Sequence, residues 1–257
     1  MVDTRAAAET AHDNAWFERV ARAGFAASGV LHILVAWIVL RLAFGDAGSA
    51  DQSGALGALL AKPGGAAMLW IAAVGLAVLG LWHVVEAFVE RDLKDRAKAA
   101  ALGVVHFALA FSAIKFATGS GQSSSQQNSG LSARLMQSGF GSALLVAVAL
   151  AVIGVGGYHV YKGVTKHFLK DLEVSGGPVV TPLGVTGYVA KGLVLAGAGI
   201  LVMVATMTSD PAKASGIDAA VKTLGAAPFG KVLLVLAAAG IAAYGAYGFV
   251  RSRYADM

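Results

Sequence analysis

The chain has 257 residues, of which 57% are hydrophobic and only 14% carry a charge. Together with a mean hydropathy of +0.69, this composition excludes an ordinary soluble domain and indicates an integral membrane protein. The absence of cysteine excludes disulfides, thiolate metal sites and cysteine nucleophiles. The net charge of +5 comes without a basic patch interleaved with aromatic residues, so we expect no nucleic-acid binding.

The first segment, residues 1–22, mixes acidic and basic residues and lacks the compact apolar run of a cleavable signal peptide. We therefore expect it to remain attached as a cytoplasmic or interfacial segment. A helix lying at the membrane surface and a frayed polar tail are both possible for its first part.

Six stretches reach the length of about 20 apolar residues that a membrane span needs. The chain is thus expected to be an all-α polytopic membrane protein with six transmembrane helices. They fall at residues 23–44, 66–89, 99–118, 141–161, 185–207 and 229–250.

Basic residues concentrate on the side of both chain ends, as in the loop with Arg91, Lys94, Arg96 and Lys98. The positive-inside rule then predicts a plasma-membrane protein with both termini in the cytoplasm.

The six spans form three copies of one two-helix unit. The first helices align as FAASGVLH, AAALGVVH and YVAKGLVL, in which Gly29, Gly103 and Gly192 coincide. The second helices then align from PGGAAMLW, GFGSALLV and PFGKVLLV to an aromatic residue near the end, which is Trp82, Tyr158 or Tyr247. We expect hairpin units at residues 23–92, 93–170 and 171–257, with those aromatic residues in an interfacial belt.

Each outer loop contains a short stretch with apolar residues at helical spacing behind a serine that can cap a helix. Short amphipathic outer helices are expected at residues 53–62, 129–138 and 215–224. The stretch GSGQSSSQQNSG, residues 119–130, lacks apolar side chains and is interpreted as a mobile loop.

These motifs resemble an uncharacterised bacterial integral-membrane family, common in actinobacteria, whose members carry this hairpin in triplicate. The resemblance covers nearly the whole chain and implies a fold without an assigned activity.

Glycine is frequent inside the predicted spans, where it allows neighbouring backbones to approach closely. We interpret the following glycines as packing sites: Gly75, Gly80, Gly154, Gly157, Gly192, Gly199, Gly240, Gly245 and Gly248.

Four histidines are candidate functional residues: His32, His83, His106 and His159. At 1.5 Å of rise per residue, all four fall in the cytoplasmic half of the bilayer. The third repeat has lost both members at once, with Leu195 and Gly248 at the equivalent positions. This paired loss suggests paired use within a hairpin.

Three interpretations of the histidines remain open. They can act as structural contacts to backbone carbonyls or neighbouring helices, or facing pairs can ligate a haem or a transition metal. In the third, His83, Glu86, His159 and Lys162 belong to a proton or quinone path. Glu86 and Lys162 occupy equivalent positions, where we expect a solvated face or, alternatively, an ion pair between them. Lys191 is expected to extend towards the headgroups.

No catalytic motif is found, and acidic residues are nearly confined to loops and helix ends. An enzyme is therefore not favoured, and no cofactor is expected. The first hypothesis is a non-enzymatic accessory or scaffold subunit, with the lipid bilayer and another membrane protein as partners. The alternatives are a redox module that binds haem or quinone through the histidines, and a channel or transporter.

Overall fold

The structure is a computed structural model that describes residues 15–90 and 92–256. Residues 1–14 of the segment expected at residues 1–22 therefore lie outside the described residues. From Ala15 onwards, this segment belongs to the first helix. The described chain is all-α. Its long helices are α2 (Ala15–Ala43), α4 (Gly65–Val89), α5 (Leu93–Ala117), α7 (Gly139–Val164), α8 (Val180–Thr208) and α10 (Gly230–Tyr254).

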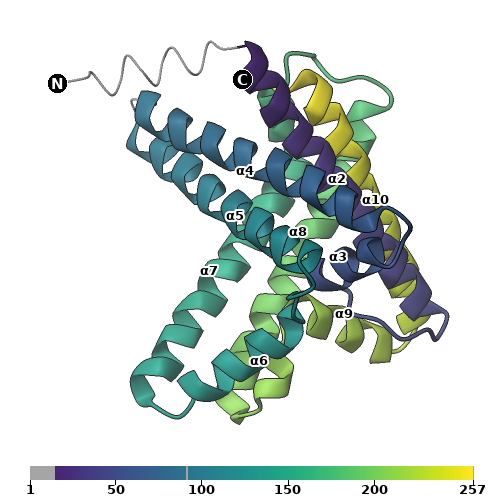
Figure 1. Ribbon diagram of the computed structural model, residues 1–257. Coiled ribbons are helices and arrows are strands. Elements are labelled where there is room, and N and C mark those ends of the chain that lie inside the picture. The colour runs from purple at the N-terminus through teal and green to yellow at the C-terminus, as the bar shows by residue number, and fades with distance from the viewer. Residues whose placement is uncertain (1–14, 91, 257) are drawn as a thin grey trace.

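Each of these six helices is long and apolar enough to cross a membrane, by length and composition. They match the six predicted spans, with ends that mostly run a little further than predicted, because hydropathy does not register polar residues in a terminal turn. α2 begins and α10 ends on the same side of the bundle, which we call the terminal face (Figure 1). There Arg22 donates a hydrogen bond to the Arg253 carbonyl oxygen and forms a salt bridge with Glu173.

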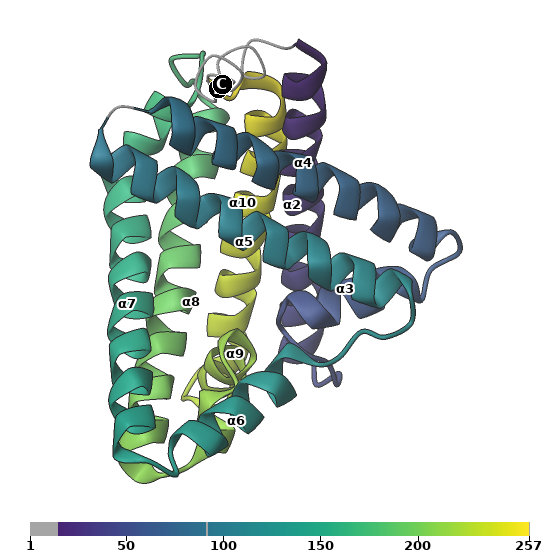
Figure 2. The same cartoon turned by 60° about the vertical axis from the view of Figure 1, so that its left-hand side comes forward.

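Three short helices lie towards the opposite side, which we call the loop face (Figure 2). They are α3 (Gln52–Leu60), α6 (Ser124–Leu135) and α9 (Ile217–Ala226). The prediction of a mobile loop at residues 119–130 is therefore wrong for residues 124–130, which form the start of α6. Ser123 caps that helix, and Ser125 donates a hydrogen bond to Asp51 at the start of α3. These polar contacts between loops stabilise a helix that composition alone does not favour.

The most extensive helix pairs join one repeat to the next rather than the two helices of one hairpin. The pairs are α4 with α5, α7 with α8, and α10 with α2. In Figure 2 the α4–α5 pair runs across the other two pairs, so the bundle consists of three splayed antiparallel pairs. Since α10 returns to α2, the last repeat packs against the first.

The same glycine crossing holds all three pairs together. A Cβ atom on Gly29 of α2 would lie 2.7 Å from the Gly245 carbonyl oxygen of α10. At the equivalent crossings, Gly192 of α8 would meet Gly156 of α7 at 2.5 Å, and Gly103 of α5 would meet Gly80 of α4 at 3.3 Å. Gly80, Gly192 and Gly245 are thus confirmed as the packing sites that we expected, and Gly29, Gly103 and Gly156 are further close contacts. Gly154 and Gly157 are not confirmed, because nothing lies within 4 Å of a Cβ atom at either position.

A second contact between a glycine and a neighbouring backbone recurs in all three copies. Gly65, Gly141 and Gly230 begin the second helix of their repeats. A methyl group at each would collide with the backbone of the short helix just before it, at Leu59, Leu135 and Gly225. The first turn of each second helix is therefore packed directly on the end of its own short helix.

The second hairpin differs from the other two because its two helices do not pack against each other, and we call such a hairpin open. α2 packs on α4 and α8 packs on α10, but α5 and α7 barely touch in the described part of the chain. In the closed hairpins a glycine of the first helix, Gly24 or Gly187, approaches the backbone of the second. Lys98 occupies that position in α5 and is exposed. A long charged side chain cannot provide the close approach that glycine permits, which explains the opening.

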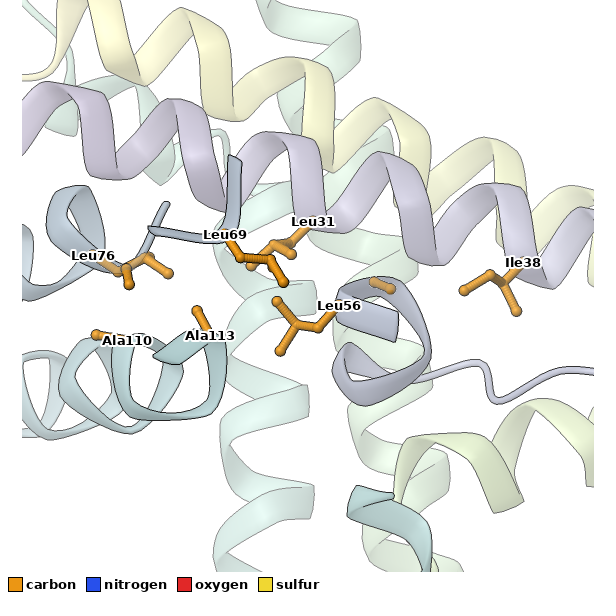
Figure 3. Packing of buried hydrophobic residues seen from close by; sticks show 9 residues of the cluster. Leu31, Ile38, Leu56, Leu69, Leu76, Ala110 and Ala113 are labelled. Carbon is orange, nitrogen blue, oxygen red and sulfur yellow. The ribbon is translucent and has the colours of Figure 1, made fainter. Parts of the chain in front are cut away.

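The largest apolar cluster lies between α2, α3, α4 and α5 (Figure 3). Leu56 of α3, Leu69 and Leu76 of α4 and Ala113 of α5 are fully buried there. On the loop face this core is bordered by Asp51, and the backbone N–H of Ala50 donates to Asp218 of α9 at 2.8 Å. The short helices thereby link the first repeat to the second and third.

Candidate functional site

Each of the four histidines lies three residues, about one helical turn, after a crossing glycine of its own helix. His32 and His106 follow Gly29 and Gly103, whereas His83 and His159 follow Gly80 and Gly156. Because the backbones are closest at the glycines, the next side chain on the same helix face is held between two helices. The positions that the sequence indicates are therefore inter-helical positions, although the helices concerned belong to different repeats.

This arrangement changes the partners that we expected. Each histidine faces the neighbouring repeat, so the three crossings carry different residues. The α4–α5 crossing has both His83 and His106. The α7–α8 crossing has His159 only, because Leu195 stands at the second histidine position, and the α10–α2 crossing has His32 only, because Gly248 stands there. The loss of both histidines from the third repeat thus leaves one histidine at each of two crossings, and does not remove a pair.

All four histidines use Nδ1 for a local hydrogen bond. Nδ1 of His32, His106 and His159 lies 2.7–2.8 Å from the backbone carbonyl oxygen four residues earlier. Nδ1 of His83 lies 2.8 Å from the Glu86 carboxylate. Because these oxygens accept hydrogen bonds, Nδ1 is the protonated nitrogen in each neutral ring, and Nε2 keeps a free lone pair.

His83 and His106 form the one close histidine pair in the described residues. Their ring centroids lie 5.0 Å apart, with the ring planes tilted by 33°. Both side chains are nearly buried. Two imidazoles that ligate one metal from opposite sides through Nε2 would place their centroids about 6 Å apart. The observed separation therefore does not fit a shared haem iron with two axial histidines.

His32 and His159 border a second polar cluster centred on Lys191 of α8. The Lys191 ammonium lies 4.0 Å from the centroid of the Tyr244 ring, on α10. The rings of His32 and Tyr244 are 4.8 Å apart, and those of His159 and Tyr188 are 5.7 Å apart. Lys191 therefore points into the bundle against an aromatic ring, and our expectation that it extends to the headgroups is wrong.

Glu86 and Lys162 do not pair with each other. Glu86 binds His83, and its side chain is 40% exposed. Lys162 is buried and forms a salt bridge with Asp171, which lies on a short 3-10 helix after α7. The amino-acid sequence gives no signal for Asp171, because the chain must reverse after α7 to bring this loop residue back to the helix.

Arg251 is a further site residue, at the position in the third repeat that corresponds to Glu86 and Lys162. Its guanidinium lies 4.1 Å from the centroid of the Phe25 ring on α2. Its Nε atom is buried without a hydrogen-bond partner. A buried donor without an acceptor is unusual, because losing its hydrogen bonds to water costs about 1–3 kcal/mol.

The aromatic residues near the ends of the second helices do not form a belt. Trp82 and Tyr247 are buried, and the Tyr247 hydroxyl donates to the Phe168 carbonyl oxygen at 3.1 Å. Their equivalent Tyr158 is 50% exposed, because α7 belongs to the open hairpin. The described residues contain no group of three or more His, Asp or Glu side chains that could hold a metal ion.

Comparison with known proteins agrees with the threefold organisation. A family model described as Domain of Unknown Function (DUF1206) matches three segments, residues 23–90, 97–166 and 186–255. The boundaries that we expect for the hairpin units extend slightly beyond these segments and remain predictions.

One relative is an uncharacterised protein of Bacillus subtilis (strain 168), YxxB. It is 27% identical over 255 residues, which cover 94% of this chain and 92% of the relative. This relative gives no support to an actinobacterial distribution. No solved structure matches the chain. Since the family model covers most of the sequence in three copies, the chain belongs to the DUF1206 family of unknown function.

Proposed function

We propose that this protein is a non-enzymatic accessory or scaffold subunit of the bacterial plasma membrane, with both termini in the cytoplasm. Its partner is a transmembrane helix of another membrane protein, which binds between α5 and α7. The observation that carries the proposal is the open second hairpin in an otherwise closed circle of helix contacts.

The exposed face of α7 supports this proposal. We define the open face as Leu144, Val148, Ala151, Val155 and Tyr158, which are all exposed. Val155 is 49% exposed, whereas its equivalent Leu79 in the first repeat is fully buried. On α5, Val105 is 51% exposed and its equivalent Leu31 only 5%. A surface that is buried in one copy and apolar but exposed in another is suited to an incoming helix.

The shape of the opening agrees with a helix as the partner. α5 and α7 diverge, and their ends towards the loop face lie far apart in both views (Figures 1 and 2). Ala151, Gly154 and Gly157 of α7 add a surface of small residues on which a second backbone can pack closely.

Photo-crosslinking in the membranes of the source organism tests the proposal. Benzoylphenylalanine replaces Val148 on the open face or, as the control, Ile71, which lies at nearly the same depth of α4 and is 72% exposed. We expect a discrete protein adduct from position 148 and none from position 71. Adducts that are absent from position 148, or equal at both positions, would refute the proposal.

A redox module is the second candidate, because all four Nε2 atoms keep a free lone pair. Metal-ligating histidines typically donate the other ring N–H to a carbonyl or carboxylate, as these four do. The absorbance spectrum, metal content and extractable quinone of the purified protein test this candidate. The scaffold proposal predicts no Soret band, no metal and no quinone, and a His83→Gln/His159→Gln double variant with an unchanged spectrum.

A further inference from the structure

The aromatic residue near the end of each second helix has a different environment in the open hairpin. Trp82 of α4 and Tyr247 of α10 are 3% and 0% exposed, whereas the equivalent Tyr158 of α7 is 50% exposed. The hydroxyl group of Tyr158 has no hydrogen-bond partner among the described residues. The two closed hairpins therefore show how this position is covered when a hairpin is complete.

In the third repeat, the segment that follows α7 covers the aromatic residue. Phe168 lies on the 3-10 helix His167–Asp171 and is fully buried. Its ring meets the Tyr247 ring edge to face, with the centroids 5.3 Å apart. Its carbonyl oxygen accepts the hydrogen bond from the Tyr247 hydroxyl at 3.1 Å. One residue thus supplies both an aromatic ring and an acceptor.

In the first repeat, the residues that follow α10 take the corresponding place. Ala255 comes directly after α10, is 2% exposed and belongs to the same buried cluster as Trp82. The two covering segments also pair with each other, because Leu172 and Ala255 form an antiparallel bridge and the Glu173 N–H donates to the Tyr254 carbonyl oxygen at 2.9 Å. Each closed hairpin is therefore covered by the segment that follows the second helix of the preceding repeat in the circle.

The second repeat lacks such a covering segment. By the same rule its cover would follow α4, but only residues 90–92 lie between α4 and α5. Three extended residues span at most about 10 Å, which is also the usual distance between the axes of two packed helices. This connection serves to join α4 to α5 and is too short to cover α7 as well.

We propose that the partner supplies the missing cover of Tyr158. This inference rests on the proposed function, because the partner helix first has to bind between α5 and α7. At the terminal face the partner helix continues into a short segment, which places an aromatic side chain against the Tyr158 ring and a backbone carbonyl oxygen within reach of the Tyr158 hydroxyl. Aromatic pairs and hydrogen bonds between helices both stabilise association in a membrane, where water exclusion contributes little.

Photo-crosslinking from position 161 in the membranes of the source organism tests where this part of the partner lies. Tyr161 is 54% exposed and its ring lies 6.5 Å from the Tyr158 ring, so benzoylphenylalanine at this position leaves Tyr158 intact. Benzoylphenylalanine at position 148 reports the binding of the partner helix itself. We expect both positions to form an adduct with the same protein. Mass spectrometry should map the adduct of position 161 to a segment that carries an aromatic residue and directly follows a membrane-spanning helix.

The Tyr158→Phe variant tests the hydrogen bond, because it removes only the hydroxyl group. With the probe at position 148, the yield of adduct per amount of protein should fall about threefold, which is the contribution of one hydrogen bond between membrane helices. Tyr161→Phe is the matched control. Its hydroxyl has no counterpart in the other repeats, where Val85 and Val250 occupy the equivalent positions, so the yield should not change.

The outcomes separate this inference from the proposed function. An adduct from position 148 but none from position 161 would overturn the inference alone, as would equal yields in Tyr158→Phe and Tyr161→Phe. An adduct of position 161 with residues 1–14 of the same chain, or with lipid only, would identify a different cover and overturn the inference as well. The absence of protein adducts from both positions would refute the proposed function, and the inference with it.

Discussion

The substitution Gly156→Ala should open the crossing between α7 and α8, whereas Gly157→Ala, at the next residue, should not. A Cβ atom at position 156 would lie 2.6 Å from the Ala196 nitrogen and 2.7 Å from the Gly192 carbonyl oxygen. Both neighbours are backbone atoms, so the helices themselves must separate by several tenths of an ångström. At position 157 nothing lies within 4 Å of the added carbon.

The expected changes in the free energy of unfolding follow from overpacking and from helix propensity. Overpacking by a single methyl group in a well-packed interior costs about 1–3 kcal/mol. Contacts along the α7–α8 pair weaken together, so we expect Gly156→Ala at the upper end of that range. Gly157→Ala adds no collision and should be neutral or stabilising by up to about 1 kcal/mol, because alanine favours the helix more than glycine does.

Equilibrium unfolding in mixed micelles of a mild detergent and dodecyl sulfate, followed by circular dichroism, gives the difference in the free energy of unfolding. Gly80→Ala should fall between the two variants, since its added carbon would meet the Phe107 side chain at 3.2 Å, and a side chain can move more easily than a backbone. Equal destabilisation by Gly156→Ala and Gly157→Ala would refute the glycine crossing as the contact that holds this pair.

Three further variants test other contacts by the same unfolding assay. Asp171→Asn leaves the buried Lys162 ammonium without its counter-charge, and it should destabilise by about 2–3 kcal/mol, somewhat less than a fully buried pair because Asp171 is partly exposed. Replacing Lys162 by Met in the same chain should recover part of this loss, and no recovery would argue against the pair. Asp218→Ala removes the acceptor of the Ala50 N–H, so a cost of about 1–3 kcal/mol is expected, and a cost near zero would contradict the link between the short helices. Tyr247→Phe leaves the Phe168 carbonyl oxygen without its donor and should cost about 1 kcal/mol; an unchanged free energy of unfolding would mean that this bond contributes nothing.

The sequence was sufficient to predict the spans and the threefold repeat. Hydropathy identifies helices of this length directly, and Gly29, Gly103 and Gly192 align because each must fit the same crossing. The depth of the four histidines in the bilayer stays a prediction, because it depends on the tilt of each helix as well as on the rise per residue.

The pairing of helices was not predictable, because a repeat in sequence does not say whether its second helix packs against its own first helix or the next one. The open hairpin has a signal in the local sequence, but this signal can be recognised only once the contacts between the helices are known. Lys98 stands where Gly24 and Gly187 allow close approach. Asp171 and the start of α6 were missed because contacts between distant loops determine their positions.

Oxygen accessibility of spin labels tests the central claim most directly, namely that contacts between successive repeats hold the bundle while the second hairpin stays open. The chain has no native cysteine, so a single label can be placed at each of three equivalent positions, Leu79, Val155 and Tyr244. In phosphatidylcholine nanodiscs the label at position 155 should be mobile and accessible to molecular oxygen, and those at positions 79 and 244 immobile and protected. A label at position 155 that is protected as well as the other two would contradict the account.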